Sequence, residues 1–138
     1  WITDDMEITY SQDREFTKEE LEELFLSAGW DSGRYPERLK RAMHGYSLVI
    51  SARDGGKLAG LICAMDDGEM TAYVHYLLVA PEWRGRGIGG RLTELVKEHY
   101  KDYLKIALIA SDGSEEFYRR PGFERADGTP MYLTEMKN

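Results

Sequence analysis

The chain has 138 residues, 42% of them apolar and 31% charged, which is the balance of one soluble globular domain and excludes a disordered or membrane-spanning protein. Its net charge of −7 argues against a nucleic-acid-binding protein, because such proteins need a basic face. The single cysteine, Cys63, excludes an internal disulfide. Residues 1–5 lack the basic and then apolar order of a secretory signal. We therefore expect one cytoplasmic domain over residues 1–138.

The first third of the chain predicts a short strand followed by two helices. Residues 7–10 form an extended segment, and Thr17 with Glu20 gives the capping-box pattern of a helix start. Apolar residues at helical spacing then predict a helix over residues 18–28. A second helix over residues 36–45 begins at a proline and ends at a glycine, as helices commonly do.

Three strands follow over residues 47–53, 57–65 and 70–79, separated by Asp-Gly turns that tolerate positive φ. The third strand has apolar residues at both alternating positions, so we expect it to be central and covered on both sides. Strict alternation places Tyr73, His75, Leu77 and Val79 on one face and Val74, Tyr76 and Leu78 on the other.

The rest of the chain predicts a helix, a strand, a short helix and two closing strands. A strand, a helix and another strand in succession indicate a parallel crossover, so the sheet should be mixed. These elements occupy residues 88–99, 105–110, 114–120, 123–126 and 131–134. The order of elements predicts a mixed α/β domain.

A glycine-rich turn at residues 84–90 begins the first of these helices. Free backbone N–H groups at the positive end of a helix favour a bound phosphate. From Gly85 the turn matches the dinucleotide pattern G-x-G-x-x-G, but that pattern belongs at the first strand of a βαβαβ unit and here it follows a meander. A Walker A loop is excluded because no Gly-Lys-Ser/Thr is present, and an ordinary surface turn remains the structural alternative.

From Arg84 the same turn matches R/Q-x-x-G-x-G. With the segment LLVAPEW before it and the pattern FY-x-x-x-GF at residues 117–123, the chain resembles the GCN5-related N-acetyltransferases, the GNAT superfamily. The resemblance covers nearly the whole chain. It implies the GNAT fold, a central mixed β-sheet flanked by helices, with two central strands that splay apart.

The resemblance also implies a site for acetyl-coenzyme A. The turn would hold the pyrophosphate, and the pantetheine arm would pair with the end of the third meander strand. The implied coenzyme-binding residues are Leu78, Val79, Arg84, Gly85, Arg86, Gly87, Ile88, Gly89 and Gly90. The Leu77 N–H is the candidate donor to the thioester carbonyl, where negative charge develops on attack.

Two side chains are candidates for proton transfer. Tyr118 resembles the family's general acid, which protonates the leaving coenzyme A sulfur, and its alternative role is that of a partly buried aromatic residue. His75 matches the histidine of arylalkylamine-type members, which acts as a base through water, and it titrates near neutrality. A packed core histidine is the alternative. Pro121 departs from the family pattern and puts the geometry of Tyr118 in doubt.

Four aromatic residues could form a pocket for the acceptor amine through packing and cation–π contact, although some of them could instead close the core. They are Trp30, Tyr35, Tyr73 and Tyr76. Three scattered histidines and one cysteine predict no metal site, and Cys63 on an apolar strand is expected to be a core thiol.

These observations predict an N-acetyltransferase that moves an acetyl group from acetyl-coenzyme A to the primary amine of a small molecule, by direct transfer in a ternary complex. One alternative is a GNAT module that binds an acyl-coenzyme A without turnover. Another is an enzyme that acts on protein amino groups. We expect neither a nucleic-acid partner nor a membrane, and a homodimer is compatible with the sequence.

Overall fold

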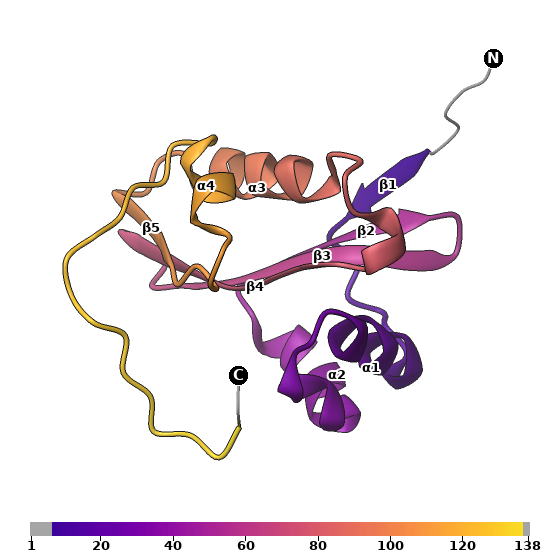
Figure 1. The fold of residues 1–138 in the computed structure, drawn as a ribbon. Coiled ribbons are helices and arrows are strands. Elements are labelled where there is room, and N and C mark those ends of the chain that lie inside the picture. The colour runs from indigo at the N-terminus through magenta and orange to yellow at the C-terminus, as the bar shows by residue number, and fades with distance from the viewer. Residues whose placement is uncertain (1–6, 137–138) are drawn as a thin grey trace.

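The computed structural model describes residues 7–136, so residues 1–6, including those considered above for a leader sequence, lie outside the described part. Its centre is a five-stranded sheet in the order β1-β2-β3-β4-β5 (Figure 1). Neighbouring strands are antiparallel from β1 to β4, and β5 pairs parallel with β4, which confirms the predicted mixed sheet. The strands are β1 (Ile8–Ser11), β2 (Leu48–Asp54), β3 (Lys57–Asp66), β4 (Thr71–Val79) and β5 (Lys105–Leu108).

Helices cover both faces of the sheet (Figure 1). We call the side covered by α1 and α2 the α1/α2 face, and the opposite side the α3 face. The α1/α2 face carries α1 (Lys18–Ser27), the 3-10 turn η1 (Asp31–Arg34) and α2 (Pro36–Gly45). After β4 the chain passes through the 3-10 turn η2 (Pro81–Trp83) to α3 (Ile88–His99) on the opposite side of the sheet. The short helix α4 (Glu115–Arg119) follows β5.

Each face of the sheet has its own apolar layer. This agrees with the prediction for the third meander strand, in which both alternating sets of side chains are apolar. On the α1/α2 face, Phe25 and Met43 pack with Leu61 and are fully buried. On the α3 face, Leu92 and Val96 pack against Ile62 and its neighbours. β4 contributes to both layers, so its predicted coverage on two sides is confirmed.

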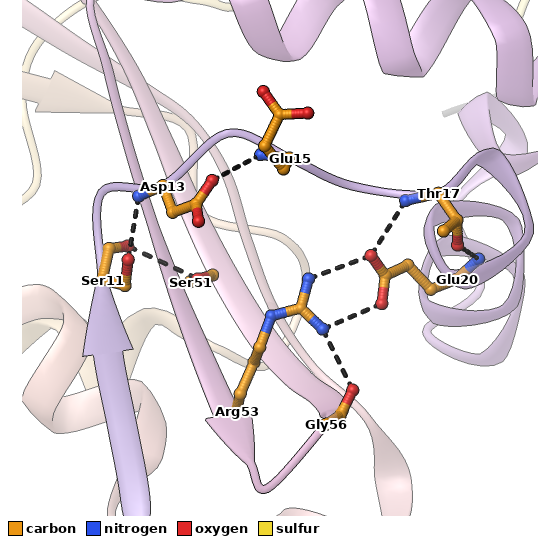
Figure 2. Close-up of polar contacts among 8 residues, drawn as sticks. All are labelled: Ser11, Asp13, Glu15, Thr17, Glu20, Ser51, Arg53 and Gly56. Carbon is orange, nitrogen blue, oxygen red and sulfur yellow. Dashed lines mark hydrogen bonds and ion pairs between the residues drawn. The ribbon is translucent and has the colours of Figure 1, made fainter.

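The predicted capping box at the start of α1 is present and also holds the helix to the sheet (Figure 2). The Glu20 N–H donates to Thr17 Oγ1 over 3.0 Å, and the Thr17 N–H donates to Glu20 Oε2 over 2.9 Å. Arg53 of β2 donates to both carboxylate oxygens of Glu20, each over 2.9 Å. Burial raises the pKa of Glu20, but the Arg53 and Thr17 hydrogen bonds outweigh it and the net direction is down.

A β-bulge in β4 makes the predicted strict alternation wrong. The pairing with β3 passes from Tyr76 to Val74 and leaves His75 without an opposite residue. The side chains before and after the bulge therefore do not alternate between the two faces in one continuous series. Leu77 and Val79 lie on the α3 face together with Val74, whereas Tyr76 belongs to the α1/α2 layer.

The two predicted closing strands, residues 123–126 and 131–134, are not formed, so this prediction is wrong, and β5 ends at Leu108 rather than at Ala110. A strand needs a partner for its backbone groups, and this part of the chain has none among the described residues. It instead leaves α4, passes the outer edge of β5 and ends close to α2 (Figure 1).

Candidate active site

The glycine turn adopts the conformation that its composition favours. Gly85 and Gly87 have φ values of +79° and +84°, a region that residues with a Cβ rarely occupy. Gly87 is the N-cap of α3, and the bond from the Arg91 N–H to the Gly87 carbonyl, 3.0 Å long, opens the helix. The N–H groups of the preceding first turn have no carbonyl partner within the helix, so they point outward at its positive end. This arrangement can bind an anion.

Gly89 lies in close contact with Phe117 of α4. A Cβ built at Gly89 would lie 3.3 Å from the ring of Phe117, whereas one built at Gly90 would meet nothing within 4 Å. The absent side chain of Gly89 therefore lets α4 pack against the start of α3. Phe117 of the FY pattern thus contacts the start of α3, although the two are far apart in sequence.

The arginines near the turn have different surroundings. Arg84 Nε donates to the Val79 carbonyl over 3.1 Å and so ties the turn to the end of β4. Arg91 lies over the ring of Tyr10, with its guanidinium carbon 6.0 Å from the ring centre, on the β1 side of α3. Arg86 is exposed within the turn.

The end of β4 has an open side. Its pairing with β5 stops at Val74 and Leu108, although β4 continues to Val79. The Ala80 N–H donates to β3, with a length of 2.8 Å. Because backbone polar groups alternate along a strand, those of Leu78 also face β3, and those of Leu77 and Val79 face the gap beyond the end of β5. The Val79 carbonyl that bonds Arg84 agrees with this direction.

His75 projects from the bulge into an aromatic cluster. Its ring stacks on Tyr76 with centres 4.1 Å apart, and its Nδ1 lies 2.7 Å from the Tyr46 hydroxyl. Tyr73 is a further neighbour, with ring centres 6.0 Å apart. Burial by these rings lowers the pKa of His75, although the side chain as a whole remains exposed on one side. A neutral imidazole with an exposed edge is able to accept a proton.

Tyr46 was not identified from the sequence, because it is the C-terminal cap of α2 and no local pattern links it to His75. Burial raises the pKa of Tyr46 strongly, so its phenol keeps its proton. Since the hydroxyl and His75 Nδ1 share a hydrogen bond, the second ring nitrogen, Nε2, is left for other partners.

The four aromatic residues expected to line an acceptor pocket separate into three groups. Tyr76 is buried, with its hydroxyl hydrogen-bonded to Ser32, and Trp30 packs edge-on against it at 5.3 Å, so both help to close the core. Tyr73 is half-buried beside His75. Tyr35 is exposed and apart from the others, with the Arg38 guanidinium 5.9 Å above its ring.

The C-terminal segment reaches the same region. Burial raises the pKa of Tyr73, and the neighbouring Tyr132 phenol raises it further. Ser32 Oγ donates to the Met136 sulfur over 3.7 Å. The segment thus crosses from the α3 face to the α1/α2 face around β5 and ends beside the aromatic cluster (Figure 1).

Tyr118 is half-buried on α4, between Phe117 and Phe123, with ring centres 5.1 Å and 5.9 Å away. Burial raises the pKa of Tyr118, so its hydroxyl is protonated near neutral pH. Within residues 7–136 no hydrogen bond or ring contact joins Tyr118 to His75. Pro121 follows the end of α4, and its carbonyl accepts a hydrogen bond from Lys97 over 2.7 Å.

The Cys63 thiol is fully buried, and burial raises its pKa strongly, as expected of a core thiol. No group of three potential metal ligands gathers within residues 7–136. No helix in that part of the chain is long and apolar enough to cross a membrane.

Comparison with known proteins identifies the protein family to which this chain is similar. A family model described as an acetyltransferase (GNAT) domain matches residues 12–132. A histidine N-acetyltransferase of Oreochromis niloticus is 43% identical over 70 residues, which are 46% of this chain and 20% of that protein. An uncharacterized N-acetyltransferase of Methanocaldococcus jannaschii is 26% identical over 147 residues, covering 90% of this chain and 65% of the relative.

A solved structure shares the fold over most of its length. The GNAT-family acetyltransferase of Streptococcus pneumoniae superimposes with a TM-score of 0.75 at 25% identity, covering 94% of this chain and 99% of that one. This chain spans only about a fifth of the length of the histidine N-acetyltransferase, and 65% of the length of the Methanocaldococcus jannaschii protein.

Proposed function

This chain belongs to the GNAT family of acetyltransferases, and from that premise we propose that it transfers the acetyl group of acetyl-coenzyme A to the primary amine of a small molecule. The observation that carries the proposal is the construction at the end of β4. A glycine turn at the start of α3, an open strand edge and a histidine whose pKa is lowered by burial all lie within residues 75–90 of one continuous segment.

The coenzyme side of the site follows from the backbone. The outward N–H groups of the turn at residues 85–90 would hold the pyrophosphate, with Arg86 adding positive charge. The pantetheine arm would lie in the gap beyond β5 and pair with the backbone groups of Leu77 and with the Val79 N–H, because the Val79 carbonyl already accepts a hydrogen bond from Arg84. Leu78 leaves the set of coenzyme-binding residues, because its polar groups face β3 and its side chain is buried in the core.

The transfer needs one bond formed and one broken. A neutral amine nitrogen attacks the thioester carbon, and the Leu77 N–H would donate to the carbonyl oxygen as negative charge develops there. The carbon–sulfur bond then breaks, and the Tyr118 hydroxyl would supply the proton that the thiolate takes. His75, through a water molecule, would accept the proton that the nitrogen loses after its attack. Proton exchange with solvent would then return His75 to its neutral form and Tyr118 to its phenol, so the cycle closes.

Two observations support a small cationic amine as the acceptor. The exposed edge of His75 and the half-buried Tyr73 offer aromatic surface and cation–π contact on the α1/α2 face. The net charge of −7 favours the approach of a cationic amine. The similarity to a histidine N-acetyltransferase makes histidine the first compound to test.

The test is a panel of amines with acetyl-coenzyme A, followed by the release of free thiol and by mass spectrometry of the product. The panel contains histidine, other amino acids, arylalkylamines and a lysine-containing peptide. We expect turnover on at least one small amine and little on the peptide. Turnover on the peptide alone would favour an enzyme acting on protein amino groups. Tight coenzyme binding by calorimetry without turnover on any amine would favour the binding module.

A further inference from the structure

The link between β1 and α1 is fixed by its own side chains. The Asp13 N–H donates to Ser11 Oγ over 2.9 Å, and the Glu15 N–H donates to Asp13 Oδ1 over 2.8 Å (Figure 2). Phe16, which follows, is buried in the α1/α2 layer. Arg14 lies between these anchors, so its backbone has a defined place.

The side chain of Arg14 reaches from this link to the C-terminal end of α2. Its Nη1 donates to the Met43 carbonyl over 3.1 Å and to the Tyr46 carbonyl over 2.7 Å. Its Nη2 donates to the Ser47 carbonyl over 3.1 Å. One planar guanidinium thus bonds three backbone carbonyls at the junction between α2 and β2. The single ammonium group of a lysine does not reproduce this fork.

These bonds have a structural use of their own. The last carbonyls of a helix have no partner within it, and a cation at that end interacts favourably with the helix dipole. Ser47 is also held from the sheet, because its Oγ accepts the Asp66 N–H over 3.0 Å. Arg14 therefore helps to fix the junction between α2 and β2.

Tyr46 lies within this junction and is held at its backbone and at its side chain. Its N–H donates to the Ala42 carbonyl over 3.1 Å, its carbonyl accepts from Arg14, and its hydroxyl lies 2.7 Å from His75 Nδ1. Only two rotatable bonds separate a tyrosine backbone from its ring, so the place of the hydroxyl depends closely on the place of the backbone. One residue thus connects Arg14 to His75.

This connection acts by position rather than by charge. The Arg14 guanidinium lies near the Cys63 thiol, where burial raises the pKa of the thiol and the positive charge opposes that rise. The lowered pKa of His75 has burial as its cause. Loss of Arg14 should therefore reach His75 through the place of the Tyr46 hydroxyl.

We propose that Arg14 is a positioning residue for the base of the reaction, and that it acts by holding Tyr46 and thereby the imidazole of His75. This inference rests on the proposed acetyltransferase function. It gives the link between β1 and α1, which touches no reacting atom, a defined part in the reaction.

Steady-state kinetics give the first test. Arg14→Ala should lower kcat by about 3–10-fold and leave the KM for acetyl-coenzyme A unchanged, because the disturbance lies on the acceptor side. Arg53→Ala is the matched control, since Arg53 also makes three hydrogen bonds but holds the opposite end of α1. Both variants should lose stability in urea, and only Arg14→Ala should lose kcat. Equal losses of kcat in the two variants would overturn the proposal.

A double-mutant cycle tests the route through Tyr46. In a Tyr46→Phe background the hydroxyl is already absent, so Arg14→Ala should lower kcat by less than about twofold further. Fully additive losses would show that Arg14 acts by another route, and would refute the proposal. Arg14→Lys keeps the charge but not the fork, and it replaces the alanine variant in both experiments if that variant does not fold.

Nitrogen NMR of labelled histidine separates this inference from the proposed function, because it does not need turnover. In the wild type the two ring nitrogens of His75 should show the widely separated shifts of one fixed tautomer. In Arg14→Ala these shifts should move toward the averaged shifts of the exposed His44. Unchanged His75 shifts would overturn the role of Arg14 even in an active enzyme. Changed shifts in a protein inactive on every amine would refute the reaction and still support the placing of His75 by Arg14.

Discussion

The hydroxyl of Tyr46 lies 2.7 Å from Nδ1 of His75 and joins the end of α2 to the bulge in β4. This bond and the stacking of the imidazole on Tyr76 fix the ring in one orientation. Nε2 is then the nitrogen left to meet a water molecule or a substrate. We therefore regard Tyr46 as a positioning residue for the proposed base.

Replacing His75 by glutamine should reduce kcat by about 10²–10⁴-fold if His75 is the base. Burial lowers its pKa below the usual 6.5, so the neutral, active form persists to lower pH and the acidic limb of kcat/KM should fall below pH 6.5. The limb should vanish in His75→Gln. An acidic limb that is unchanged in this variant would remove His75 from the reaction.

Tyr46→Phe should lower kcat by roughly 3–30-fold, which is the size of effect expected when a base loses its orientation but keeps its chemistry. The KM for acetyl-coenzyme A should not change, because Tyr46 lies on the acceptor side. Tyr35→Phe serves as the matched control, since Tyr35 is exposed and apart from the cluster. Equal effects of the two substitutions would argue against a positioning role.

Tyr118→Phe should cut kcat by about 10²-fold with little change in coenzyme binding, because only the proton donor is lost. Burial raises the pKa of Tyr118 above 10, so the wild type should keep this donor throughout the neutral and mildly alkaline range. Steady-state kinetics and calorimetry with coenzyme A separate the two effects. Unchanged turnover would assign Tyr118 a packing role beside Phe123.

Gly87→Ala and Gly90→Ala should separate fold from binding. An alanine at Gly87 would be held at φ +84°, which costs about 1–2 kcal/mol of folding free energy and disturbs the N–H groups of the turn. At Gly90 a Cβ meets no protein atom, so stability should hold or rise. Both variants should bind coenzyme A more weakly, measured by calorimetry alongside urea unfolding. Full affinity in both would contradict a coenzyme site at the turn.

Glu20→Gln should lower the free energy of unfolding by about 1–2 kcal/mol, because the charge-assisted bonds to Arg53 are lost. The folded-state pKa of Glu20 lies below its unfolded value, so its stabilisation is present above pH 4.5 and disappears as the pH falls through the folded pKa. The gap between wild type and variant should therefore close in acid. Glu23→Gln, whose pair with Lys57 is exposed, should have little effect.

The sequence by itself determined the elements whose signals are local. The capping box of Thr17 and Glu20 starts α1, the turn glycines separate the meander strands, and the glycines at 85 and 87 take the positive φ values that only such residues adopt readily. A helix between two strands was sufficient to predict the parallel pairing of β4 and β5. These features depend on neighbours a few positions apart, so residue order is enough to specify them.

Only the tertiary structure decided how distant residues meet. The bulge at His75 arises from the pairing with β3, and it moves Leu77 and Val79 to a face that strict alternation does not predict. The contact of Tyr46 with His75 requires α2 to pack on the sheet. The last segment has the pattern of strands but forms none here, because a strand exists only where a partner supplies its hydrogen bonds.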